Sequence, residues 1–144
     1  MAAMSSFNNF LERALLDHVW GDDSYTAPNP IWVGLSTTPI AEDGSGITEP
    51  TDGYERQSVV NNLTNFPAAS TDGADETVKT NGEPIEFPTA TGNWGEVTHF
   101  FFANDDAGAV GEEILAYGVL DTAKTIQDGD TATFAVDAIE IYLD

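Results

Sequence analysis

Short apolar segments of strand length, each ended by Gly, Pro, Asn or Asp, limit most strongly what this chain can fold into. Residues 31–36 and 97–103 are almost wholly apolar, and residues 139–143 alternate between apolar and polar as a strand with one solvated face does. No helical segment lies between these strands, which disfavours a parallel α/β sheet. We therefore expect an all-β fold, an antiparallel β-sandwich of jelly-roll type with about seven or eight strands.

The expected strands cover residues 31–36, 54–61, 85–87, 97–103, 115–120, 124–126, 131–134 and 139–143. Residues 70–83 are weakly apolar and rich in Asp, Thr and Gly, so we expect a surface loop there. No internal repeat and no linker divides the sequence. We expect a single domain over residues 1–144, with the sandwich at 30–144.

One amphipathic helix is predicted ahead of the sandwich, over residues 5–20. Ser5 or Ser6 suits the N-cap, Gly21 suits the end, and apolar residues recur between them at helical spacing. The apolar stripe must pack on something, either the chain's own strands or a neighbouring subunit. The candidate interface residues are Phe7, Phe10, Leu11, Leu15, Trp20 and Trp32.

Acidic residues outnumber basic ones by 25 to four, which gives a formal net charge of −21. The acids are spread along the whole chain, so they do not form an acidic tail. Such a surface repels itself in dilute buffer, and molar salt screens the repulsion. We interpret the charge as an adaptation to high salt, which indicates a halophilic source.

The composition also excludes several functions. Four basic residues cannot form a stripe that follows phosphates, so we expect no nucleic-acid partner. No apolar stretch is long enough for a membrane helix, so no membrane insertion is expected. The absence of Cys excludes a thiolate zinc site and a Cys nucleophile.

We find no pattern of catalytic or cofactor-binding residues. The histidines, His18 and His99, have no triad partner in any recognisable motif, and both are interpreted as structural. Asp128 and Asp130 flank Gly129 and are the best candidates for a cation site, but they lack the rest of a calcium loop. We favour a hairpin turn there, and expect no cofactor and no specific metal, only weakly bound cations.

Aromatic residues could form a platform for a sugar, although in a small sandwich they more often belong to the core or an interface. They are Trp20, Trp32, Trp94, Tyr117 and Tyr142. Asn62 begins an N-glycosylation sequon, a short motif that fits a protein exposed outside a cell.

The motifs of the chain follow one another in a distinctive order. They lie at residues 6–21, 31–38, 44–46, 53–57, 81–100, 115–120, 129–134 and 139–144, and the most specific part is 84–100, with its Phe-Pro, Trp-Gly and Val-Thr-His elements. In this order the chain resembles a family of small virion structural proteins of tailed viruses, usually labelled tail fibre or minor structural protein. The resemblance implies a non-enzymatic β-sandwich module displayed on a virus particle.

Together with the acidity, the resemblance suggests a tailed virus of a halophilic archaeon. The leading expectation is a head turret or decoration subunit on the particle surface, assembled in the host cytoplasm. The alternatives are a tail-fibre or baseplate component for host attachment, and a carbohydrate-binding module. The expected partners are other virion proteins, further copies of the chain as a homo-oligomer, and a glycan of the host surface.

Overall fold

The computed structural model describes residues 1–71, 76–107 and 109–143. Its elements are, in chain order, β1 (Ala3–Phe7), α1 (Asn9–Trp20), β2 (Ile31–Ser36), β3 (Gln57–Val59), β4 (Ser70–Thr71), β5 (Thr77–Thr80), β6 (Ile85–Glu86), β7 (Gly95–Ala103), β8 (Ile114–Ile126), β9 (Thr133–Phe134) and β10 (Ile139–Tyr142). The fold is therefore mostly β with one helix, as predicted. The strand bounds at residues 31–36 are also those predicted.

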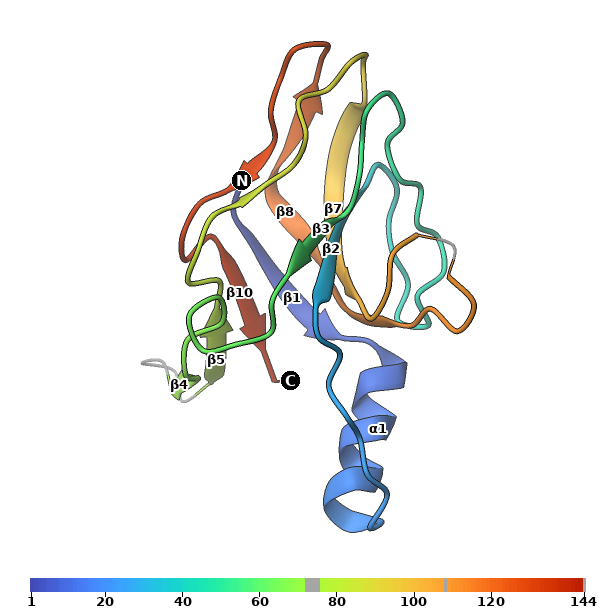
Figure 1. Cartoon of the computed structure of the whole chain (residues 1–144), viewed down its shortest axis with the longest axis vertical. Helices are drawn as coiled ribbons and strands as arrows, with labels where there is room; N and C mark the ends of the chain where they lie inside the picture. Colours follow the sequence, from blue (N-terminus) through green and yellow to red (C-terminus); the bar gives the residue numbers. More distant parts are fainter. Residues whose placement is uncertain (72–75, 108, 144) are drawn as a thin grey trace.

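Within the described residues, eight strands form one curled sheet and two form a small second one (Figure 1). The large sheet has the order β3-β2-β7-β8-β1-β10-β5-β4, and β6 pairs with β9. These unequal sheets do not confirm a jelly roll. Strand pairing is antiparallel except between β1 and β10, which run parallel. The expectation of a wholly antiparallel sheet was wrong at this pair, because β1 enters the middle of the sheet between two late strands.

Apolar side chains fill both faces of the sheet around β7. Phe100 and Phe102 join the main core cluster, and Phe101 and Ala103, on the opposite face, join a smaller second cluster. A strand buried on both sides is continuously apolar, which explains the unbroken run at residues 97–103.

The predicted helix at 5–20 begins too early. Residues 3–7 form β1, with Ala3 and Ser5 buried and Met4 exposed, and the N-cap is Asn8 instead of Ser5 or Ser6. The Asn8 side chain accepts a hydrogen bond from the Phe10 amide. Small buried residues give a weak strand signal, so the helical spacing of the later apolar residues extended the prediction too far.

Other boundaries also differ from the prediction. In the loop expected at 70–83, residues 70–71 form β4 and residues 77–80 form β5, which pairs with β10, and residues 72–75 lie outside the described residues. Residues 115–120 and 124–126 belong to one long strand, β8, whose polar residues between them are exposed. The strand predicted at 54–61 covers only residues 57–59.

Two glycines permit close approaches inside the sheet. A Cβ atom at Gly34 would lie 2.6 Å from Cε1 of Phe101, and one at Gly118 would lie 2.6 Å from Cε1 of Phe100. Real side-chain atoms do not approach so closely. Glycine at these positions therefore lets the two phenyl rings approach the neighbouring backbone closely.

A buried asparagine joins the two sheets. The Asn81 side chain, 1% exposed, donates to the carbonyl oxygens of Glu83 and Ala135 and accepts from the amide of Ile139. It therefore connects the start of β10 to the segments that precede β6 and follow β9. The two sheets and their connections depend on one another through this side chain.

Candidate functional site

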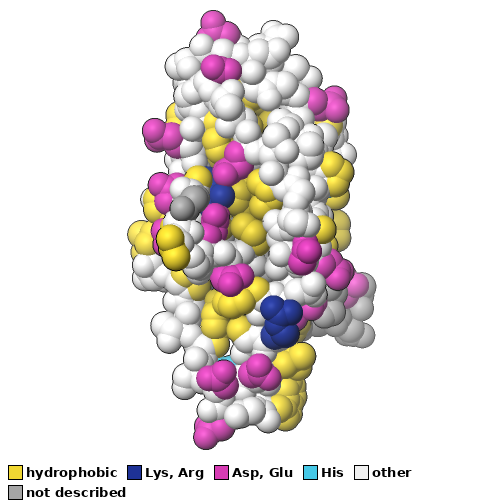
Figure 2. Space-filling view, turned by 90° about the vertical axis from the view of Figure 1, so that its right-hand side faces the viewer, with side chains coloured by type: hydrophobic (Ala, Val, Ile, Leu, Met, Phe, Trp, Pro, Cys, Tyr) yellow, Lys and Arg dark blue, Asp and Glu magenta, His cyan; other side chains and the backbone are white. Residues whose placement is uncertain are grey.

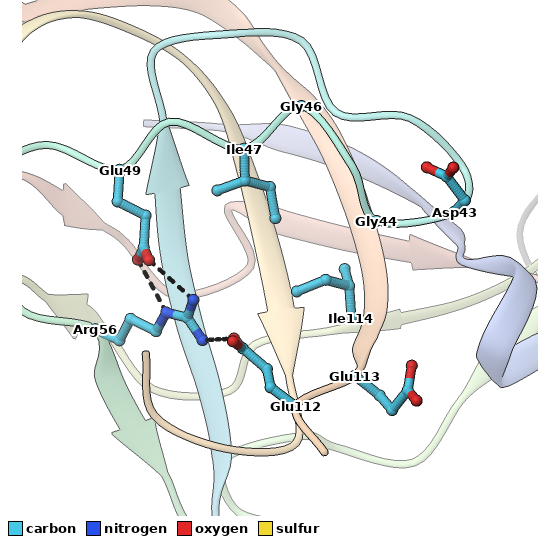
Figure 3. A pocket seen from close by; sticks show the side chains of 9 residues that line it. All are labelled: Asp43, Gly44, Gly46, Ile47, Glu49, Arg56, Glu112, Glu113 and Ile114. Carbon is cyan, nitrogen blue, oxygen red and sulfur yellow. Dashed lines mark hydrogen bonds and ion pairs between the residues drawn. The ribbon is translucent and has the colours of Figure 1, made fainter. Parts of the chain in front are cut away.

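Arg56 is the centre of a cluster of contacts on the second face of the sheet (Figure 3). Its Nε and Nη2 atoms donate to the two carboxylate oxygens of Glu49, each at 2.9 Å. Its Nη1 atom donates to Glu112 and to the carbonyl oxygen of Asp105. The guanidinium carbon lies 4.8 Å from the centre of the Phe101 ring. Arg56 thus ties the β2–β3 connection to the β7–β8 connection.

The contacts of Arg56 indicate that this cluster stabilises the fold and does not bind a ligand. Burial by itself lowers the pKa of the Arg56 guanidinium, but the hydrogen bonds to Glu49 and Glu112, together with the negative charges of these carboxylates, raise it overall. A cavity of about 430 Å³ lies beside it, and Figure 3 shows the Glu113 carboxylate pointing away from Arg56 and the Asp43 carboxylate at the far end of the lining. Arg56 is the one cation lining this cavity and is already held by two carboxylates. We therefore assign this cluster to the anchoring of the two connections.

Helix α1 leaves the end of the curled sheet and points away from it (Figure 1). None of its residues is buried. Phe10 and Leu11, at its base, are half-buried and pack against the main core. Most of the helix is therefore an arm that extends beyond the strands.

The chain covers one side of this arm itself. After Gly21 it runs back along the helix toward β2 (Figure 1). The Tyr25 amide donates to Nδ1 of His18 at 3.2 Å, and the Tyr25 ring meets Phe10 edge-on. Burial raises the pKa of Tyr25. The returning segment, residues 21–30, is thus fixed against the helix.

The other side of the arm is open and apolar. It forms a groove of about 510 Å³, which we call the α1 groove, lined by Phe7, Glu12, Leu15, Leu16, Val19, Trp20 and Leu143. Leu16 is 57% exposed, Val19 59% and Trp20 80%. In Figure 2, acidic side chains are scattered from top to bottom of the face in view, and hydrophobic side chains gather at its lower right, at the end of the molecule that carries α1. The α1 groove is the candidate functional site.

The structure brings some of the predicted interface residues together. Phe7, Leu15 and Trp20 line the α1 groove. Phe10 and Leu11 turn toward the core, and Trp32 packs with the second cluster on the sheet. Their contact with a partner stays a prediction.

The histidines make local contacts. His18 bonds to the returning segment as described, and Nδ1 of His99 lies 2.7 Å from the Thr98 hydroxyl. Burial lowers the pKa of His99. Among the described residues, no three His, Asp or Glu side chains gather so as to hold a metal ion.

Asp128 and Asp130 lie in a tight turn between β8 and β9. The Asp130 carboxylate accepts from the Gln127 amide, and Gly129 has a φ of +87°. The predicted hairpin was wrong, because β9 pairs with β6 and not with β8.

The aromatic residues proposed as a sugar platform lie on different parts of the structure. Trp94 is buried, and its indole N–H donates to the Asp52 carbonyl oxygen at 3.0 Å. Trp20 lies on the arm, and Trp32 and Tyr117 pack with the second cluster. Asn62 is exposed, and its side chain accepts from the amides of Thr64 and Asn65. Its glycosylation stays a prediction.

Sequence reasoning missed the Arg56 cluster and the residues Leu16 and Val19 as groove residues. The one signal for the Arg56 cluster is that basic residues are rare in this chain. With 25 acidic residues and four basic ones, a buried arginine is expected to form ion pairs with carboxylates. Leu16 and Val19 continue the helical apolar stripe and could have been included with Leu15.

A comparison with known protein families identifies the family of this chain. Residues 6–142 match the family model described as podophage GP4 fiber I protein gp80. The chain belongs to this family. The gp80 match runs from β1 to β10 and includes the arm, and it confirms the resemblance to a fibre or structural family of tailed viruses. The match does not bear on the halophilic archaeal source, which stays a prediction.

No curated protein matches the chain. In the described part of the chain, no helix is both long and apolar enough to cross a membrane.

Proposed function

We propose that this chain is a non-enzymatic structural subunit of a tailed-virus fibre, attached to the particle through the α1 groove. The observation that carries the proposal is the match to the gp80 fibre family across residues 6–142, which takes in the sheet and the arm together. The description of that family supports the tail-fibre alternative over the head turret or decoration subunit that the sequence analysis put first.

The energetics of the arm support attachment through it. A helix of 12 residues is marginal in water by itself, and this one has no buried residue. Covering Leu16, Val19 and Trp20 would contribute about 2 kcal/mol for each side chain. An apolar groove of this kind marks an interaction surface.

Other properties of the subunit follow from the same proposal. We propose that it lies on the outside of the particle, forms a homo-oligomer there and is assembled in the host cytoplasm. The charge of −21 supports a virus of a halophilic archaeon. The burial of Trp94 removes support for glycan binding on an aromatic platform.

Gold-labelled antibodies against the chain, imaged on intact particles, test the proposed place. Label on fibres at the tail is the expected result. Label distributed over the head would favour the turret or decoration subunit and overturn the fibre proposal.

Incorporation of variants tests the role of the arm. The triple variant Leu16→Ser, Val19→Ser, Trp20→Ser should be folded but absent from particles. Its matched control, Val60→Ser, Leu63→Ser, Val136→Ser, removes exposed apolar side chains elsewhere and should be incorporated normally. Full incorporation of the arm variant would contradict attachment through α1. Deletion of residues 1–20 is unsuitable because residues 3–7 are an inner strand.

A further inference from the structure

We infer that the α1 groove receives an apolar segment of another virion protein that places a Lys or Arg against Glu12, and not a second copy of this chain. The inference rests on the proposed function and adds the chemistry of the partner.

Glu12 lies inside the apolar stripe of the helix. At 100° per residue, Glu12 shares a face with Leu15, Leu16 and Val19, and it lines the groove with them. Its carboxylate is solvated in the free chain. An apolar segment seated on the groove would remove that water, and an unpaired buried carboxylate is strongly unfavourable. The segment must therefore bring a cation to this position.

The described residues around the groove do not supply that cation. None of the residues named above as lining the groove is basic. Arg13, the next residue along the helix, lies about 100° around the axis from Glu12. The ion pairs of Arg56 are made with Glu49 and Glu112, not with Glu12.

A second copy of the arm would fit poorly. In a parallel pair of α1 helices Glu12 would face a second Glu12, and in an antiparallel pair it would face the apolar end near Val19 and Trp20.

The size of the groove agrees with a short segment. It has seven lining residues, whereas stable dimers use about 20–30 residues on each side. A groove of this size accepts a few anchors of an amphipathic helix at positions i, i+3, i+4 and i+7.

Three synthetic peptides test the inference. Each is an amphipathic helix of about four turns with a leucine stripe, neutral elsewhere, and with Lys, Gln or Glu at one central position of the stripe. Trp20 is the reporter, because it is 80% exposed, whereas Trp94 is 4% exposed and Trp32 packs against the second cluster away from the groove. Docking should therefore shift the emission of Trp20 to the blue. The measurements are made on the full chain in about 1 M salt, where general charge attraction is screened.

The Lys peptide should bind about tenfold more tightly than the Gln peptide, as a charge-assisted pair would provide, and the Glu peptide most weakly. Glu12→Gln should remove this ranking and Glu12→Lys should invert it. The matched control Glu96→Gln, which has the same change in total charge away from the groove, should keep it.

Equal affinity of the three peptides, or no binding of the Lys peptide, would overturn the inference. A blue shift that depends on protein concentration without peptide would assign the groove to a second copy and overturn it as well. In each of these cases loss of the arm variant from particles would leave the proposed function standing, so the two failures are distinguishable.

Discussion

At the scale of single residues, the second face of the sheet depends on the contact between Gly34 and Phe101, with Arg56 above the ring. Gly34→Ala forces the buried ring to move, and should lower the free energy of unfolding by roughly 2 kcal/mol, as overpacking does. Urea denaturation measures this. Phe101→Leu in the Gly34→Ala background should recover part of the loss. An unchanged midpoint in the single variant would contradict the steric reading.

Tyr54 makes stability depend on pH at the alkaline end. Burial first, and then the charge of Glu49, raise the pKa of its hydroxyl above the ordinary value of 10.0. In the unfolded chain the phenol ionises near pH 10, while the folded chain keeps the proton. Its contribution is therefore complete below pH 10 and is lost as the pH rises above it.

The variant Tyr54→Phe should show a flatter decline of stability above pH 10 than the parent chain. It should also be less stable at neutral pH, because the Leu35 amide loses the acceptor that it contacts at 2.8 Å. Thermal melts across the alkaline range measure both effects, with Tyr142→Phe as the control at a half-buried position. Parallel declines in parent and Tyr54→Phe would refute the assignment.

The buried strands could be predicted from the sequence, because a strand buried in the core consists almost wholly of apolar residues. Residues 31–36 and 97–103 are strands of this kind. The Arg56 cluster could not be predicted, since the sequence holds 25 carboxylates and only the folding of two loops selects Glu49 and Glu112. Three of the candidate interface residues, Phe7, Leu15 and Trp20, line the α1 groove, because helical spacing identifies an apolar stripe. It does not identify which side of the helix the chain itself covers.

At the scale of elements, the buried side chain of Asn81 links the two sheets. Asn81→Ala removes three hydrogen bonds at a buried site and should cost roughly 3 kcal/mol of unfolding free energy. Asn93→Ala is the matched control, since it removes one hydrogen bond, to the Gly95 amide, at an exposed site and should cost about 0.5 kcal/mol. Chemical denaturation measures both variants. Similar losses of unfolding free energy in the two would contradict the proposed link between the sheets through Asn81.

The elements that sequence reasoning misplaced share a physical cause. β1 buries small residues, β5 lies near the sheet edge with polar threonines, and the outer half of β8 is exposed. In each, backbone pairing to a distant strand decides the conformation. The hydrophobicity of a short segment does not show which distant strand it pairs with.

At the scale of the whole molecule, the charge predicts a dependence on salt. Glu49 and Glu112 form ion pairs with Arg56, but the chain has only four basic residues for its 25 acidic ones, so most carboxylates have no cation to pair with. Raising KCl from about 0.1 M to about 1 M shortens the Debye length from about 10 Å to about 3 Å, so the melting temperature should rise.

Differential scanning calorimetry measures this rise, and sucrose is the control for general solute exclusion. A sucrose effect as large as that of KCl, or an unchanged melting temperature and oligomer size at both salt concentrations, would contradict the interpretation of the acidity.

The position of β1 has a consequence for how the chain is made. Its neighbours in the sheet, β8 and β10, are translated after most of the chain, so residues 3–7 stay unpaired while the ribosome adds more than a hundred further residues. Contacts so distant in sequence form slowly. β4 and β5 can join the rest of the sheet only after β10 has been synthesised. A product that stops before residue 139 lacks the strand that joins β1 to β5, and two edges that are paired in the finished protein remain open to aggregation.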